Sequence, residues 1–121
     1  INVMPASKYW EIWAKTPFGA TSWTHRPLGT MVLSLGYRTG VPWNETHFAD
    51  PEFDAALDDA EATLDVEARR VKMERVQKIM QDAAISCIPF YRPLYSIVNS
   101  GVMGLELHPT NYHQFNKVWK A

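Results

Sequence analysis

The pattern of apolar and polar positions is most regular between residues 50 and 83, where it predicts two consecutive helices. Asp50, Pro51 and Glu52 have the order of an N-cap, a proline at the first helical position and an acidic side chain facing the helix dipole. Apolar residues then follow at helical spacing, at Phe53, Ala56, Leu57, Ala60 and Leu64. A very short turn would connect this helix to the next.

Asp65 begins the second predicted helix in the same way, with Glu67 in its first turn. Its buried face is predicted from the apolar residues Met73, Val76, Ile79, Met80 and Ala83. Its charged side chains are expected to remain in solvent: Arg69, Arg70, Lys72, Glu74, Arg75 and Lys78.

The elements before residue 50 are predicted to be short. Residues 1–4 have the character of a strand end, and Ser7 is a plausible N-cap for a helix that continues to Lys15. Residues 20–24 form a short β-prone run, residues 30–37 are interpreted as a helix of about two turns, and residues 39–47 as a loop.

After residue 84 the chain has the character of short strands at 85–90, 94–98 and 102–107, with a turn at 99–101. Pro89 suits a strand end or an edge. The tail from His108 to Ala121 has no clean period but is apolar enough that we expect it to dock. Cys87 lies in an apolar stretch, and we expect a buried, inert thiol because free cysteine is usually buried.

Composition indicates one globular domain and excludes several classes of partner. The chain has 121 residues, of which 46% are hydrophobic and 21% charged, and its net charge is -1. That balance gives no electrostatic reason to expect nucleic acid or anionic membranes. No apolar run approaches the roughly 20 residues of a transmembrane helix. Because the chain begins with Ile1, we expect a piece of a longer protein.

The richest group of chemically versatile side chains runs from Trp23 to Gly29. Trp23, Thr24, His25 and Arg26 combine a stacking face, a hydroxyl, an imidazole and a planar cation, which suits a small polar ligand. A merely decorated turn before a helix is the alternative. Three further candidates lie in or beside the predicted loop, where ligand contacts concentrate: Tyr37, Trp43 and Asn44. The aromatic residues expected in the core are Trp10, Trp13 and Trp119.

Catalytic, metal and cofactor sites are not supported by the spacing. His108 and His113 are five positions apart, and His25 and His47 have no adjacent ligand. The carboxylates lie at predicted helix starts or on solvated faces, and phosphate-loop and nucleophile-elbow motifs are missing. We therefore expect no enzyme, no metal and no cofactor.

An ordered set of residues resembles the C-terminal part of the family 5 extracellular solute-binding proteins, the oligopeptide and dipeptide receptors of ABC importers. The matching positions run from an Asn through a helix and a strand to a Val-x-Gly: Asn44 to Phe48, Asp50 to Leu57, Ala60, Asp65, Arg69, Ile88-Pro89 and Val102 to Gly104. They cover most of the chain in the family's order.

The resemblance implies an α/β fold: part of the C-terminal lobe of a two-lobed, type II-like periplasmic binding protein, with a mixed sheet and flanking helices. Residues 1–94 would belong to that lobe, and residues 95–121 would return towards the first lobe. It also implies a periplasmic receptor, made with a signal peptide, that passes a small solute or peptide to ABC permease subunits. The full receptor is expected to be a monomer, whereas the fragment could self-associate through surface left uncovered.

One departure from the family pattern affects the expected ligand. Family receptors often have an Asp shortly after the Trp, which pairs with a peptide's α-ammonium, whereas Trp23 is followed by Thr24, His25 and Arg26. A cation there would repel an ammonium, so an anionic or blocked ligand is favoured, and sugars remain open. A small α+β protein-interaction module that uses its aromatic patches is the second hypothesis, and a hydrolase is the third.

Overall fold

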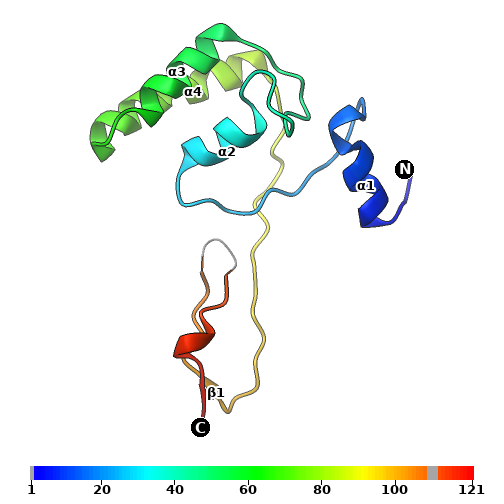
Figure 1. Cartoon of the computed structure of the whole chain (residues 1–121), viewed down its shortest axis with the longest axis vertical. Coiled ribbons are helices and arrows are strands. Elements are labelled where there is room, and N and C mark those ends of the chain that lie inside the picture. Colours follow the sequence, from blue (N-terminus) through cyan, green and yellow to red (C-terminus); the bar gives the residue numbers. More distant parts are fainter. Residues whose placement is uncertain (1, 109–111) are drawn as a thin grey trace. The chain divides into compact units, whose positions relative to one another are not determined.

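The computed structural model describes residues 2–108 and 112–121 (Figure 1). It combines helices with two short strands. The chain divides into two compact units. We call residues 2–21 and 28–87 the helical unit, and residues 22–27 with the described part of 88–121 the arm unit. In chain order the elements are α1 (Ala6–Ile12), η1 (Trp13–Lys15), α2 (Gly29–Gly36), α3 (Pro51–Glu61), α4 (Val66–Ala83), β1 (Val102–Met103), η2 (Phe115–Lys117) and β2 (Trp119–Lys120).

The predicted helix pair is confirmed as α3 and α4, and both predicted N-caps are present. The Asp50 carboxylate accepts hydrogen bonds from the backbone N–H groups of Glu52 (2.7 Å) and Phe53 (3.2 Å). Asp65 accepts one from the N–H of Ala68 at 2.8 Å. These carboxylates satisfy donors that the first helical turn leaves unpaired, so each helix begins where its cap residue stands.

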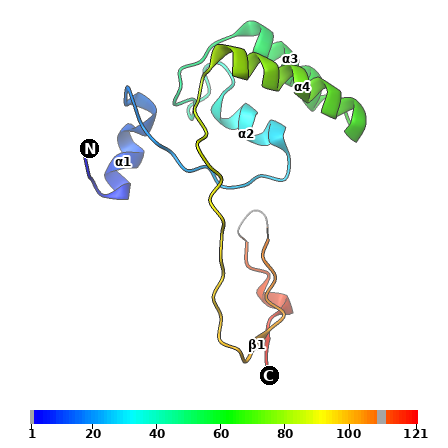
Figure 2. The ribbon, with the colours of Figure 1, turned by 180° about the vertical axis from the view of Figure 1, so that it is seen from behind.

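The core of the helical unit lies between α2, α3 and α4, which lie together in both views (Figures 1 and 2). Phe53, Leu57 and Val76 are fully buried, and the Phe48 ring meets Phe53 edge-on with 5.4 Å between centroids. The short predicted helix at 30–37 is confirmed as α2. Its partly buried residues Val32 and Leu33 pack against this core.

Two positions of the predicted apolar stripes are exposed. Leu64 is 89% exposed because α3 ends at Glu61, so that Leu64 lies in the turn and not on the buried face of the helix. Ala83 is also exposed, at the last residue of α4. The buried apolar residues therefore lie in the central turns of each helix. The apolar spacing alone did not show where each helix ends, and the apolar residues at those C-terminal ends are exposed.

The first helix differs from its prediction in its cap and its burial. It begins at Ala6 after Pro5, without a side-chain cap, so Ser7 lies inside α1 and not at its N-cap. Trp10 is 54% exposed and Trp13 is half-buried, so the prediction that they are core residues is wrong. Instead, the ring of Trp10 meets those of Tyr9 and Trp13 edge-on, at centroid distances of 5.5 and 5.6 Å. Residues 2–4 form no strand, and Ile1 lies outside the described residues.

Residues 20 and 21 tie this helix to the loop before α3. The Tyr9 hydroxyl donates to the carbonyl of Ala20 at 3.2 Å and lies 2.9 Å from the hydroxyl of Thr21. Thr21 in turn donates to the Glu45 carboxylate at 2.5 Å. The predicted β-prone run at 20–24 forms no strand, and these side chains make its contacts instead.

The arm unit contains an antiparallel pair of strands, in which Val102 lies opposite Lys120 and Met103 opposite Trp119. This pair ties the end of the tail to residues 102–103, but the apolar side chains on which the prediction of docking rested stay exposed, among them Tyr112 and Phe115. Residues 109–111 of that tail lie outside the described residues. Gly104 allows the close approach: its φ is +77°, and a Cβ there would lie 2.1 Å from the carbonyl oxygen of Lys117. Trp119 is 58% exposed, so it is not the core residue that we predicted.

The strands predicted at 85–90 and 94–98 are not formed, and the one predicted at 102–107 is limited to β1. Residues 88–98 are instead an extended segment, seen as a long trace in Figures 1 and 2. No strand of the described chain pairs with it, since its backbone makes no hydrogen bond to the described residues. Most of its large apolar side chains are exposed, among them Phe90, Tyr91, Tyr95 and Ile97.

Cys87 is exposed, so the prediction of a buried thiol is wrong. It lies between the end of α4 and the extended segment, where the helix no longer provides a packing face. Within residues 2–108 and 112–121, no helix has the length and apolar character that a bilayer crossing requires.

Candidate functional site

The structure divides the seven predicted site residues between the two units. Trp23 to Arg26 belong to the arm unit, and Tyr37, Trp43 and Asn44 belong to the helical unit. Each set is therefore described by itself.

The segment 22–27 presents polar side chains, without forming a helix or strand. Thr24 and His25 are exposed, whereas Trp23 and Arg26 are half-buried. Nη1 of Arg26 donates to the Thr24 hydroxyl at 2.7 Å and to the carbonyl of His25 at 3.4 Å. Because both bonds use the same nitrogen, the other guanidinium nitrogens of Arg26 make no hydrogen bond to the described residues.

Arg92 approaches the same segment from the extended part of the chain. Its Nη2 donates to the Ser22 hydroxyl at 3.3 Å, across a separation of 70 positions in sequence. The arm unit thus contributes two guanidinium groups and two hydroxyls around one short segment. Sequence reasoning found Arg26 through its neighbours but missed Arg92 and Ser22, because no local pattern reports a contact of that separation.

The charges of the arm unit are unbalanced. Residues 22–27 and 88–121 contain one acidic residue, Glu106, and a larger set of basic ones, Arg26, Arg92, Lys117 and Lys120, for a net charge of +3. Glu106 is paired with Lys117 at 3.1 Å. Neither arginine forms an ion pair with a described carboxylate, so the positive charge beside Trp23 is uncompensated.

Asn44 is a structural residue of the loop between α2 and α3. It is buried, and its side-chain amide donates to the carbonyls of Tyr37, Arg38 and Phe48 at 3.4, 3.2 and 2.7 Å. Its Oδ1 accepts from the Thr46 hydroxyl at 2.8 Å. Both N–H groups of the amide are used, shared among the three carbonyls, so the side chain holds three points of the loop together.

The two aromatic candidates of the helical unit differ in exposure. Tyr37 is 9% exposed and belongs to the core cluster, so its ring is mostly withdrawn from solvent. Trp43 is 45% exposed, so nearly half of its surface is in contact with solvent.

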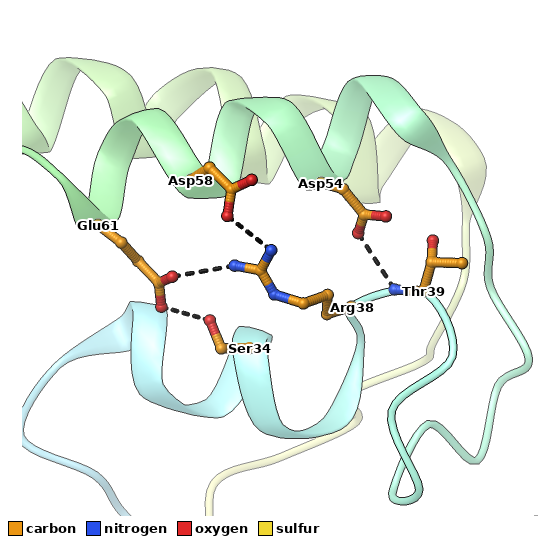
Figure 3. Close-up of polar contacts among 6 residues, drawn as sticks. All are labelled: Ser34, Arg38, Thr39, Asp54, Asp58 and Glu61. Carbon is orange, nitrogen blue, oxygen red and sulfur yellow. Dashed lines mark hydrogen bonds and ion pairs between the residues drawn. The ribbon is translucent and has the colours of Figure 1, made fainter.

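Arg38, which the sequence patterns did not single out, lies in a network of ion pairs and hydrogen bonds between α2 and α3 (Figure 3). Its Nη1 donates to Asp58 at 2.6 Å and its Nη2 to Glu61 at 2.9 Å. Glu61 also accepts from Ser34, while the N–H of Thr39 donates to Asp54 at 3.1 Å. The hydrogen bond to Asp58 raises the pKa of Arg38, against the opposing effect of its partial burial.

This network joins α2 to α3 and is saturated, because each charged group in it faces an opposite charge or a donor. A ligand would have to displace these internal partners. We therefore interpret the network as a lock between the helices and not as a binding site.

An open depression of about 400 Å³ lies on the surface of α3 and α4. Its charged lining residues are already engaged: Arg75 with Glu52 at 3.1 Å, and Lys78 with Asp82. None of the predicted binding residues borders it. Such neutralised pairs leave little unsatisfied charge for a ligand.

The histidines give no support to a metal site. His113 stacks on Phe115 with 5.5 Å between ring centroids, and His108 lies 6.2 Å from the ring of Tyr112. In the part of the chain that the structure describes, no three His, Cys, Asp or Glu side chains are grouped so that they could hold a metal ion.

Comparison of the chain with protein-family models, with curated proteins and with solved structures gave no match in any of the three. The functional interpretation therefore depends on the motifs of the sequence and on the geometry of the two units.

Proposed function

We propose that this chain is part of the substrate-binding component of an ABC importer, which captures a small polar solute, peptide-like or anionic, in a cleft between two lobes. The chain would belong to the C-terminal lobe, and the solute would pass to permease subunits in the membrane. In this proposal the protein is extracytoplasmic and performs no chemistry on its ligand.

The proposal is carried by one observation: the residues of the family-like pattern occupy positions on which the local fold depends. Asn44 pins the loop before α3, and Asp50 and Asp65 cap the two helices. Arg69 donates to the carbonyls of Thr63 and Leu64, at 3.0 and 3.4 Å, in the turn between them. If the match to the family pattern had arisen by chance, we would not expect its residues to fall on helix caps and loop contacts in this order.

The extended segment 88–98 is a second source of support. It presents large exposed apolar side chains on a backbone that has no partner among the described residues. Such a segment is costly in water and suits a strand that is completed by other parts of a larger protein.

The experiment that tests the function is native mass spectrometry of the gently purified full-length protein, which weighs any retained solute. A small bound molecule, released on unfolding, is the expected result. If no solute is retained, and thermal unfolding is unaffected by peptides, acidic solutes and sugars, the proposal of solute capture is wrong.

The exposed segment also favours the second hypothesis, a protein-interaction module, because an apolar extended segment can pair with a strand of another protein. Sedimentation of the 121-residue chain beside the full-length protein separates the two. Self-association of the short chain alone supports the receptor, whereas equal self-association of both supports the interaction module.

A further inference from the structure

The geometry of the arm unit points to a site for the oxyanion of a small acidic ligand, a carboxylate or a phosphate, formed by Arg26 and Arg92 with the hydroxyls of Ser22 and Thr24. This inference rests on the proposed function, because it names the chemical class of the solute. It adds Arg92 and Ser22 to the residues that the sequence pattern indicated.

The hydrogen bonds leave the donors of this site free for a ligand. Arg26 binds the Thr24 hydroxyl, and Arg92 binds the Ser22 hydroxyl, each through a single terminal nitrogen. Each hydroxyl accepts in its bond, so its own hydrogen remains available to donate. The remaining N–H groups of the two guanidinium heads have the fork geometry that suits a carboxylate or phosphate.

The spacing along the segment also favours a common site. Ser22, Thr24 and Arg26 alternate with Trp23 and His25, and the contact between Arg26 and Thr24 joins side chains two positions apart. In an extended run, alternate side chains share a face. The hydroxyls and the arginine are therefore expected on one face, which Arg92 reaches through Ser22.

Charge pairing distinguishes these two arginines from three arginines of the helical unit. Arg38, Arg70 and Arg75 each form an ion pair with at least one carboxylate. Arg26 and Arg92 form none with the described residues, although the whole chain has more acidic than basic residues. The two guanidinium groups bring like charge to the same short segment, and a bound anion would offset that charge.

The test is isothermal titration of the full-length protein with three probes: N-acetyl-dialanine, its C-terminal amide, and inorganic phosphate. The first offers a carboxylate, the second is its neutral match, and the third distinguishes phosphate recognition from carboxylate recognition. We expect at least one of the two anions to bind, and the amide to bind about tenfold more weakly than the acid or not at all.

Four variants assign the site. Arg26→Ala and Arg92→Ala should each weaken binding of the anion about tenfold or more, and Arg26→Lys should retain part of it. Arg70→Ala is the matched control, because Arg70 is an exposed arginine that pairs only within α4, with Glu67 and Glu74. It should leave the affinity within about twofold of the unchanged protein.

Several outcomes overturn the inference, and they are separable from failure of the proposed function. If the anion binds equally well to both alanine variants, or if only Arg26→Ala weakens it, the paired site is wrong. If the protein retains a neutral or cationic solute and binds neither anion, solute capture stands and the oxyanion site is wrong. If it retains no solute and binds no probe, both are wrong.

Discussion

The guanidinium of Arg38 lies 2.6 Å from the carboxylate of Asp58 and thereby joins the segment after α2 to the middle of α3. The same group donates to Glu61, near the end of that helix, at 2.9 Å. Its side chain is 26% exposed, so solvent screens it less than a pair such as Arg70 with Glu67, whose side chains are 63% and 76% exposed.

Replacing Arg38 with Ala should therefore lower the free energy of unfolding of the helical unit by about 1 kcal/mol, the upper end for partly exposed pairs. The helix-surface change Arg70→Ala is the control and should cost less than about 0.5 kcal/mol. Urea unfolding of Arg38→Ala, Asp58→Ala and the double variant measures the coupling. Strictly additive effects of the two changes would contradict a direct interaction.

The raised pKa of Arg38 predicts how the destabilisation caused by Arg38→Ala depends on pH. A cation whose pKa is raised by folding stabilises the fold fully below its ordinary pKa and loses that effect only when the pH rises through the higher, folded value. Arg38 thus stays charged at all pH values near neutrality. The destabilisation caused by Arg38→Ala should not change between about pH 6 and 9.

Asn44 gives a larger predicted effect because it is buried and its amide donates to three carbonyls. Asn44→Ala removes the side-chain donor of all three carbonyls, of which that of Arg38 still accepts from the N–H of Val41, and should cost about 2–3 kcal/mol of unfolding free energy. Thr46→Ala, which removes one hydroxyl from the same loop, is expected to cost about 1 kcal/mol. Equal urea midpoints for the Asn44 variant and the unchanged chain would show that the loop does not depend on this amide.

The helix pair was the most predictable part of the fold, because its signals are local. Asp50 and Asp65 mark both starts, and the spacing of Phe53 and Leu57 marks the buried face. The error at Leu64 arose because no cap residue marks the end of α3. The apolar periodicity continues along the sequence beyond the point where the helix ends.

The strands were predicted poorly for a different reason. Residues 94–98 have strand composition, but a strand exists only when another strand pairs with it, and that partner is not encoded locally. The same limit applies to the site. Trp23 to Arg26 were visible as a cluster of chemically useful side chains, whereas the contact of Arg92 with Ser22 depends on a distant segment.

Leu57 offers a test of where the core lies. It is fully buried, and Leu57→Ala should destabilise the helical unit by about 2–4 kcal/mol through lost apolar burial and the cavity left behind. Leu64→Ala removes the same atoms from an 89% exposed position and should change stability by less than about 0.5 kcal/mol. Similar losses for the two variants in urea unfolding would mean that Leu64 is covered in solution.

Gly104 should be intolerant of any side chain. Its φ is +77°, and an added Cβ would lie 2.1 Å from the Lys117 carbonyl oxygen, so the backbone would have to move. Gly104→Ala is expected to remove the cross-strand NOEs between Met103 and Trp119. Gly40→Ala is the control for backbone strain without a steric clash, because Gly40 has φ +74° and an added Cβ there would have nothing within 4 Å. It should lower the free energy of unfolding by only about 1 kcal/mol. Retained NOEs in the Gly104 variant would contradict this close approach.

Cys87 connects the structure to the proposed function, because its thiol reports whether the neighbouring segment is covered. In the 121-residue chain it is exposed and should react with dithiobis(nitrobenzoate) at a rate within about threefold of the urea-unfolded chain. If residues 88–98 are completed by the rest of a larger receptor, the thiol beside them should react about tenfold more slowly in the full-length protein. Cys87→Ser supplies the blank in both chains, since Cys87 is the single cysteine among these 121 residues. Fast reaction in both chains would show that the extended segment is uncovered in the full-length protein and would count against the receptor proposal. Slow reaction in the short chain would contradict the exposure of Cys87 itself.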